Sequence, residues 1–155
     1  MKTIYRNLII IVVAIFATNF TANAQSLSLE KASNIKGVTS VYISKMMLSQ
    51  IGESKLVGGV NIEDIASYLN SVEIVIAEDK NCAKELRQET NKLSKLPGVE
   101  LLTKIKDDDE NVTIYGKMKG NIYEAVLLIV DDGEDLIVIL ITGNIPLDKI
   151  AELTK

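Results

Sequence analysis

Apolar and polar residues alternate along the second half of the chain. In residues 99–106 and 112–119 every second side chain is broadly apolar, which is typical of strands with one buried face. Two denser apolar runs follow at residues 122–130 and 136–142. Short polar or glycine-containing turns separate these four segments, so the pattern predicts a four-stranded antiparallel meander.

The first half of the chain predicts single strands separated by short helices. Strands are expected at residues 38–44 and 72–77, and helices at residues 45–51, 62–69, 81–95 and 147–154. In the 81–95 helix, Leu86 and Leu93 belong to a narrow apolar stripe, and Pro97 marks its end. This order predicts an α+β fold. The sheet is mostly antiparallel with a C-terminal four-stranded meander, and the helices lie mainly on one face.

The first 24 residues have the composition of a secretory signal peptide. Lys2 and Arg6 form a basic start, residues 8–17 an apolar run, and residues 22–24 a small-x-small cleavage site. The apolar run is shorter than the roughly 20 residues that a membrane span requires. No cysteine follows it, which argues against a lipid anchor. We therefore expect cleavage near Ala24, a periplasmic or secreted mature protein, and no stable membrane anchor.

The mature chain is predicted to consist of a leader at residues 25–36 and a single α+β domain at residues 37–155. The whole chain has a net charge of −4, and loss of Lys2 and Arg6 with the signal makes the remainder more acidic. An acidic chain without a basic patch is poorly suited to nucleic acid, so we expect no nucleic-acid partner.

The residue types present exclude several kinds of catalysis. The chain has no histidine and only one cysteine, so it lacks Ser-His-Asp and Cys-His arrangements and histidine-ligated zinc. Carboxylate-based hydrolysis is the remaining enzymatic alternative, although the sequence has no tryptophan for sugar stacking. Cys82 fits a small buried side chain near a helix start better than an intermolecular disulfide or reactive thiol. We expect no catalytic residues and no cofactor.

Two acidic turns are the candidates for cation binding. In a meander, the turns at residues 107–111 and 131–135 lie at the same end of the sheet, where clustered carboxylates suit calcium. The first turn fails the helix-loop-helix calcium pattern, because Val112 replaces the required glycine and Met118 the required glutamate. Solvated turns are one interpretation, and weak binding of a cation or basic partner is the other. The weak metal candidates are Asp107, Asp109, Asp131, Asp132 and Asp135.

The apolar runs at residues 125–130 and 136–141 do not alternate, so both faces of these strands need cover. One face is expected to hold Val126, Leu128, Val138 and Leu140. The other face is expected to hold Leu127, Ile129, Ile137, Ile139 and Ile141. That second face is buried either by other parts of the chain, including the leader, or by a second copy in a homodimer or an envelope protein partner. The predicted interaction surface is Leu127, Ile129, Ile139 and Ile141.

The segments GVTSVYISKMML at residues 37–48 and VTIYGKMKGNIYEAVLLIVDDGEDLIVILITGNIPLDKIAEL at residues 112–153 carry a family likeness. They resemble a family of exported bacterial proteins known as domain of unknown function 4252. The resemblance implies an exported, single-domain α+β protein and supplies no catalytic residues. Many relatives are lipoproteins, from which this chain differs by lacking the lipid-attachment cysteine.

The expected function is therefore that of an exported, non-enzymatic binding or interaction protein of the bacterial cell envelope. The alternatives are a cation-binding module that uses the acidic hairpin turns and a carboxylate-based hydrolase.

Overall fold

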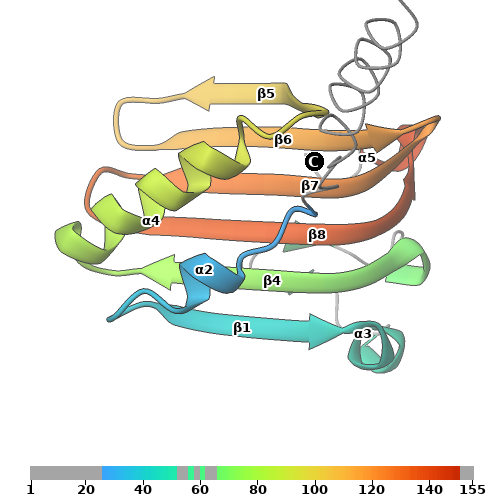
Figure 1. Cartoon of the computed structure of the whole chain (residues 1–155), viewed down its shortest axis with the longest axis horizontal. Coiled ribbons are helices and arrows are strands. Elements are labelled where there is room, and N and C mark those ends of the chain that lie inside the picture. Colours follow the sequence, from blue (N-terminus) through green and yellow to red (C-terminus); the bar gives the residue numbers. More distant parts are fainter. Residues whose placement is uncertain (1–25, 52–55, 58–59, 62–65, 151–155) are drawn as a thin grey trace, which may run out of the picture.

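A six-stranded antiparallel sheet forms the centre of the computed structural model, which describes residues 26–51, 56–57, 60–61 and 66–150. The strand order is β1-β4-β8-β7-β6-β5 (Figure 1). The strands are β1 (Thr39–Ser44), β4 (Leu69–Ala77), β5 (Val99–Lys106), β6 (Asn111–Lys119), β7 (Ile122–Asp131) and β8 (Leu136–Pro146). A separate short hairpin consists of β2 (Leu56–Val57) and β3 (Val60–Asn61). The predicted α+β fold and its C-terminal meander are confirmed.

Of the helices in the described residues, two lie across the same face of the sheet (Figure 1). These two are α2 (Glu30–Ser33) and α4 (Lys80–Leu93). The other helices described are α3 (Lys45–Ile51), the 3₁₀ helix η1 (Ala66–Tyr68) and α5 (Leu147–Ile150). Within the described parts of the chain, no helix has the length and apolar content that a bilayer crossing requires.

Asp79 fixes the start of α4. Its carboxylate accepts hydrogen bonds from the backbone amides of Asn81 and Cys82, at 2.9 and 3.1 Å, which satisfies two amide groups without helical partners. The helix ends at Leu93, and Gly98 follows with a φ of +81°, a conformation that glycine adopts without strain. The helix predicted over residues 81–95 is therefore present, displaced by one or two residues at each end.

Helix prediction failed just before β4. The predicted helix covered residues 62–69, of which 62–65 lie outside the described residues. In the described part, Ala66–Tyr68 forms only a 3₁₀ turn, and Leu69 already begins β4 by pairing with Gly143 of β8. Leu69 is fully buried in this pairing, so tertiary packing overrides the local helical pattern. The predicted signal peptide and residues 151–154 of the predicted closing helix also lie outside the described residues.

The sheet separates two apolar clusters, one on each face. The helix-face core lies between the sheet and α2 and α4, and its buried members are Leu27, Leu29, Ala32, Val75, Ala77, Cys82, Ala83, Leu86, Ala125, Leu127, Leu136, Val138 and Leu140. The second-face core contains Leu48, Leu69, Val72, Ile74, Ile114, Tyr123, Val126, Ile139, Ile141 and Ile145. Both faces of the central strands are thus buried within a single chain, which explains why β7 and β8 do not alternate.

The segment predicted as a leader is part of the helix-face core. Leu27, Leu29 and Ala32 are 6%, 0% and 2% exposed. The backbone amide of Leu29 donates a hydrogen bond of 3.1 Å to the Glu73 carboxylate on β4. The segment therefore covers the same face as α4 rather than the opposite one, and the packed domain begins before residue 37.

Candidate interaction surface

The two acidic turns lie at the same end of the sheet, as the meander predicted (Figure 1). One turn joins β5 to β6 and the other joins β7 to β8. Their closest approach is set by the register of β6 and β7, in which Asn111 pairs directly with Asp131. The end of the first turn is therefore adjacent to the start of the second.

Asp131 is bound by an arginine of α4. Arg87 donates from Nε to Oδ2 of Asp131 at 2.7 Å and from Nη2 to Oδ1 at 2.6 Å. The same Nη2 reaches the backbone carbonyl of Gly133 at 3.1 Å. The hydrogen bonds from Arg87 lower the pKa of the Asp131 carboxyl below its ordinary value, and those bonds raise the pKa of Arg87. Asp131 is consequently a structural ion-pair partner, not a vacant ligand.

The other acids of these turns mostly shape the backbone or reach solvent. Asp132 Oδ1 accepts from the amides of Glu134 and Asp135 at 2.9 and 2.7 Å, and Asp107 Oδ1 accepts from the amide of Asp108 at 2.7 Å. Such local hydrogen bonds are the usual reason for aspartate in turns. Lys80 of α4 also forms an exposed ion pair with Glu134 at 2.9 Å.

The structure does not bring the five metal candidates together as a cation site. Among the described residues, no group of three or more Cys, Asp or Glu side chains is placed to hold a metal ion. Asp131 is engaged with Arg87, while Asp107 and Asp132 accept amide hydrogen bonds within separate turns. Asp109 and Asp135 are exposed. Arg87 and Lys80 of α4 supply positive charge to the turn between β7 and β8.

The predicted apolar interaction surface combines residues from opposite faces of the sheet. In the observed register Leu127 pairs with Leu140, and Leu128 pairs with Ile139. Residues directly opposite each other on antiparallel strands point to the same face. Leu127 and Ile129 therefore pack in or against the helix-face core, whereas Ile139 and Ile141 belong to the second-face core. The assignment of all four to one face was wrong.

The turn between β7 and β8 explains this error. Asp131 pairs with Leu136 across a four-residue connection, so odd-numbered residues of β7 lie opposite even-numbered residues of β8. A register offset by one residue exchanges the two faces of a strand. Leu127, Ile139 and Ile141 are 0%, 1% and 2% exposed within one chain. They contribute to the core and present almost no surface to a partner.

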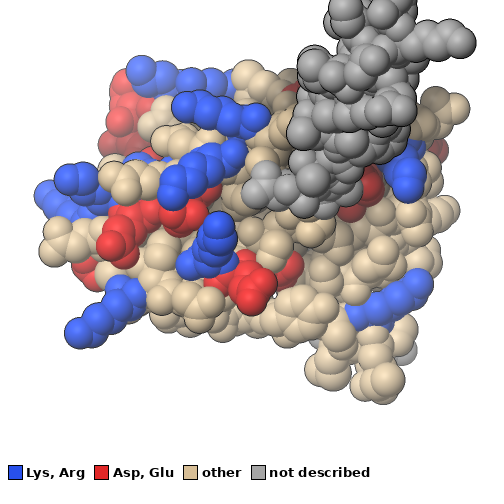
Figure 2. Space-filling model, in the orientation of Figure 1, with Lys and Arg blue, Asp and Glu red and all other residues tan. Residues whose placement is uncertain are grey.

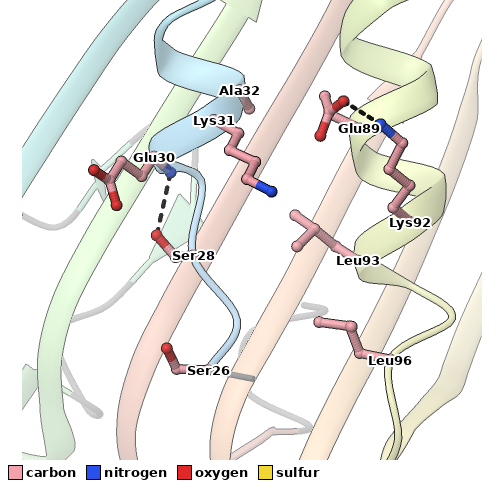
Figure 3. Close-up of a pocket in the computed structure, with 9 residues that line it drawn as sticks. All are labelled: Ser26, Ser28, Glu30, Lys31, Ala32, Glu89, Lys92, Leu93 and Leu96. Carbon is pink, nitrogen blue, oxygen red and sulfur yellow. Dashed lines mark hydrogen bonds and ion pairs between the residues drawn. The ribbon is translucent and has the colours of Figure 1, made fainter. Parts of the chain in front are cut away.

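A shallow pocket of about 230 Å³ lies between α2 and α4 (Figure 3). Lys31 projects into the gap from α2, and Leu93 and Leu96 line its other side. The nearby Glu89 and Lys92 pair with each other, and the Ser28 hydroxyl accepts a hydrogen bond from the Glu30 amide. Two of the polar contacts at this pocket therefore join neighbouring residues of the same segment.

Cys82 has the buried position that the sequence predicted, at the start of α4. Its Sγ lies 2.9 Å from Asp79 Oδ2 and 3.1 Å from the Lys36 carbonyl oxygen, so its single S–H group has two acceptors within reach. The hydrogen bond to Asp79, followed by burial, raises the pKa of the thiol. A thiol is activated as a nucleophile by a lowered pKa, so this environment has the opposite effect.

Sequence reasoning missed a group of exposed apolar side chains on β1 and at the start of α3. We define the β1–α3 corner as Val41, Tyr42, Met46 and Met47, which are 44%, 67%, 72% and 50% exposed. In Figure 2 this corner is mostly uncharged, whereas lysine, arginine and acidic side chains gather over α4 and the neighbouring end of the sheet. The signal was present in the sequence. Residues 46–48 are consecutive and apolar, and a helix cannot turn three consecutive side chains toward one core.

In α3, Leu48 takes the buried position, at 1% exposure. The two preceding methionines consequently point away from the core. Methionine side chains are flexible and polarizable, and such residues are frequent at surfaces that bind other proteins.

These features define an α+β domain with an open antiparallel sheet. At one end of the sheet, acidic residues form ion pairs with α4, and the β1–α3 corner exposes apolar side chains. The chain belongs to the family described as Domain of unknown function (DUF4252), whose sequence model matches residues 29–153. The match includes α2, in agreement with the packing of that segment into the domain. Comparison with curated proteins and with solved structures gives no match.

Proposed function

We propose that this protein is exported to the bacterial cell envelope and acts there as a non-enzymatic binding protein. The proposal of export rests on the first 24 residues, whose basic start, short apolar run and Ala22-Asn23-Ala24 site have the pattern of a cleaved signal peptide. The proposal of binding rests on the β1–α3 corner.

The exposure of the β1–α3 corner is the observation that carries the binding proposal. The Met46 and Tyr42 side chains are 72% and 67% exposed, and Met47 is 50% exposed. Single exposed apolar residues are ordinary, but four within one short stretch of the chain, an aromatic ring and two methionines among them, favour a protein contact. Binding would remove this surface from water, which gives the contact a favourable hydrophobic contribution.

The described side chains give little support to catalysis. Cys82 is held as a thiol by Asp79, and Glu89 and Lys92 at the pocket between α2 and α4 pair with each other. General acid–base catalysis needs a titratable group directed at a substrate position. The acidic turns offer carboxylates, but Asp131 is paired with Arg87. Binding is therefore the function that this geometry supports best.

A capture experiment with matched variants tests the binding proposal. The tagged full-length gene is expressed in a Gram-negative host, and the mature protein is cross-linked in an envelope extract. We expect specific partners to be recovered with the wild type and lost with the double variant Met46→Lys, Met47→Lys. Ile105→Lys is the control, because Ile105 is 54% exposed on the distant edge strand β5. Equal recovery with all three proteins would overturn a role for this corner.

Export is tested separately. The intact mass of the protein from the periplasmic fraction should correspond to a chain that begins at Gln25. A protein that stays in the cytoplasm with residues 1–24 attached would contradict the export proposal, without bearing on the binding surface.

A further inference from the structure

The two edges of the sheet differ in how they are protected against pairing. β5 carries Glu100, Lys104 and Lys106, and its register with β6 shifts between Leu101 and Thr103. Charged side chains and bulges are the usual devices that prevent an edge strand from pairing with another chain. Both the charged side chains and the bulge therefore protect the β5 edge against pairing with another strand.

β1 has neither protection. Its sequence, TSVYIS, contains no charged residue and no proline. It pairs with β4 without a register shift, from Thr39 opposite Ile76 to Ser44 opposite Ser71. As the terminal strand of the sheet, it pairs on its outer side with no strand among the described residues. Its first four residues are exposed, so a regular, neutral row of backbone groups is open to another strand.

We propose that β1 pairs antiparallel with β1 of a second copy of this chain, joining the two sheets into one continuous sheet. This inference rests on the proposed binding function and names its partner. Backbone hydrogen bonds between the two edge strands supply the main contact, as in other cases of strand addition. The exposed side chains of Met46 and Met47, in the first turn of α3 after Lys45, extend the contact beyond the backbone.

The distribution of side chains on β1 favours a second copy over an unrelated partner. Val41 and Ile43 lie opposite Ile74 and Val72, so they belong to the second face, whereas Tyr42 lies opposite Glu73 on the helix face. A twofold axis perpendicular to the sheet keeps each face on its own side. On the second face, apolar β-branched residues of the two copies then lie opposite each other.

On the helix face, Ser40, Tyr42 and Ser44 of the two copies meet in the same way. Hydroxyl, aromatic and β-branched cross-strand pairs are each favourable, and no like charges are brought together. If two β5 strands paired about such a twofold axis, Lys104 and Lys106 of one copy would lie close to the same lysines of the other. That arrangement is unfavourable because like charges repel.

A groove beside β1 adds to the fit. It has a volume of about 300 Å³ and is lined by Ser28, Ser40, Tyr42, Glu73 and neighbouring residues of α2, β1 and β4. It lies on the helix face, the side on which the Tyr42 of a second copy would project. The groove gives that ring a place to pack and gives its hydroxyl group polar neighbours.

Light scattering and sedimentation of the purified mature protein over a range of concentrations test this inference directly. We expect a monomer–dimer equilibrium in the wild type. Val41→Lys and Tyr42→Lys should each weaken the dimer by about tenfold or more, because each places two lysines close together across the twofold axis. Ile105→Lys on β5 is the matched control and should leave the dimer unchanged. Circular dichroism melts establish that all variants are folded.

Hydrogen exchange supplies a second readout that needs no variant. Backbone amides in Thr39–Ser44 should exchange more slowly in concentrated than in dilute wild-type protein, while those of β5 should not differ. A monomer at every concentration overturns self-pairing, as does a dimer that Ile105→Lys disrupts and Val41→Lys does not. If the purified protein is monomeric but envelope partners are still lost with Met46→Lys, Met47→Lys, the proposed function stands and only this inference fails.

Discussion

Arg87 of α4 and Asp131 of β7 form a two-point contact between a helix and the end of the sheet, with N–O distances of 2.7 and 2.6 Å. The residues are 44 positions apart in the sequence. Their side chains are 31% and 26% exposed, so solvent screens them only in part. Because Arg87 also donates to the Gly133 carbonyl, one side chain holds α4 against both the strand and its turn.

Replacement of Arg87 should therefore reduce stability. Arg87→Ala removes the two hydrogen bonds to Asp131 and the one to Gly133, and it leaves the Asp131 charge without its partner. We expect a loss of about 1–2 kcal/mol in the free energy of unfolding. Arg87→Lys keeps the charge but not the forked geometry, so it should restore only part of this. Urea denaturation of the variants measures both effects.

Lys80 provides the control for this prediction. Its ion pair with Glu134 is 2.9 Å long, but both side chains are 74% exposed. Exposed pairs of this kind contribute little, so Lys80→Ala should leave the urea midpoint nearly unchanged. If Lys80→Ala and Arg87→Ala destabilise the protein equally, the special role assigned to the Arg87–Asp131 contact is wrong.

The same contact predicts a pH dependence of stability. The folded-state pKa of Asp131 lies below its ordinary value of 3.8, chiefly because of the hydrogen bonds from Arg87. The stabilisation that it provides is fully present above that ordinary pKa, and it is lost as the pH falls through the lowered, folded-state pKa. Asp131→Asn cannot gain or lose this proton.

The difference in unfolding free energy between wild type and Asp131→Asn should consequently be constant near neutral pH and shrink in acid. Asp79, whose pKa is also lowered, is present in both proteins and cancels from the comparison. Urea titrations at a series of pH values from neutral to strongly acidic measure the difference. A difference that grows as the pH falls would contradict the stabilising role of the ionised Asp131 carboxylate.

Cys82 should be a slowly reacting thiol. Its hydrogen bond to Asp79 and its burial raise its pKa, so the thiolate fraction near neutral pH is reduced. Iodoacetamide should therefore modify the native protein at least about tenfold more slowly than the unfolded protein. Asp79→Asn preserves a good helix cap but removes the negative charge, so it should increase the native rate.

The control for the thiol experiment is the rate in denaturant, which should be the same for wild type and Asp79→Asn. A native rate equal to the unfolded rate would show that neither burial nor the Asp79 carboxylate protects the thiol. In that case Asp79→Asn would leave the native rate of modification unchanged.

Local patterns were sufficient to predict most of the strands. The alternation of residues 99–106 predicts β5 with the bounds that the structure shows, and β6 and β7 each differ by one residue. Alternation is a local property of a strand with one buried face, so it is visible in the sequence. The buried Cys82 and the common end of the two acidic turns were predictable for similarly local or topological reasons.

The features that sequence could not supply depend on contacts between distant segments. The face that Leu127 shares with Leu140 is set by register, which a pattern of continuous apolar residues leaves open. The pairing of Arg87 with Asp131 joins elements that no local pattern relates. The sequence around Leu69 favours a helix, but Leu69 lies in β4 because it pairs with Gly143 of β8. These are tertiary effects, and they determine which candidate sites are exposed.

Gly143 marks one such tertiary contact, where β8 passes close to the start of β4. A Cβ atom at this position would lie 2.2 Å from the Tyr68 carbonyl oxygen and 2.9 Å from the Leu69 Cα. Both obstacles are backbone atoms, so relief requires movement of the chain itself. We expect Gly143→Ala to cost about 2–3 kcal/mol, the upper part of the range for overpacking, as measured by urea denaturation.

Gly116 on β6 is the informative comparison for Gly143. Its added Cβ would meet the buried Tyr123 ring at 2.5 Å and Leu102 Cδ1 at 2.8 Å, which are side-chain atoms, so repacking can relieve the contact without movement of the backbone. Gly116→Ala should therefore cost less, about 1 kcal/mol. The order of the two variants is the decisive result, because it separates a backbone obstacle from a side-chain obstacle. If Gly143→Ala is the more stable of the two, the close approach of β8 to Tyr68 does not constrain the fold as the structure indicates.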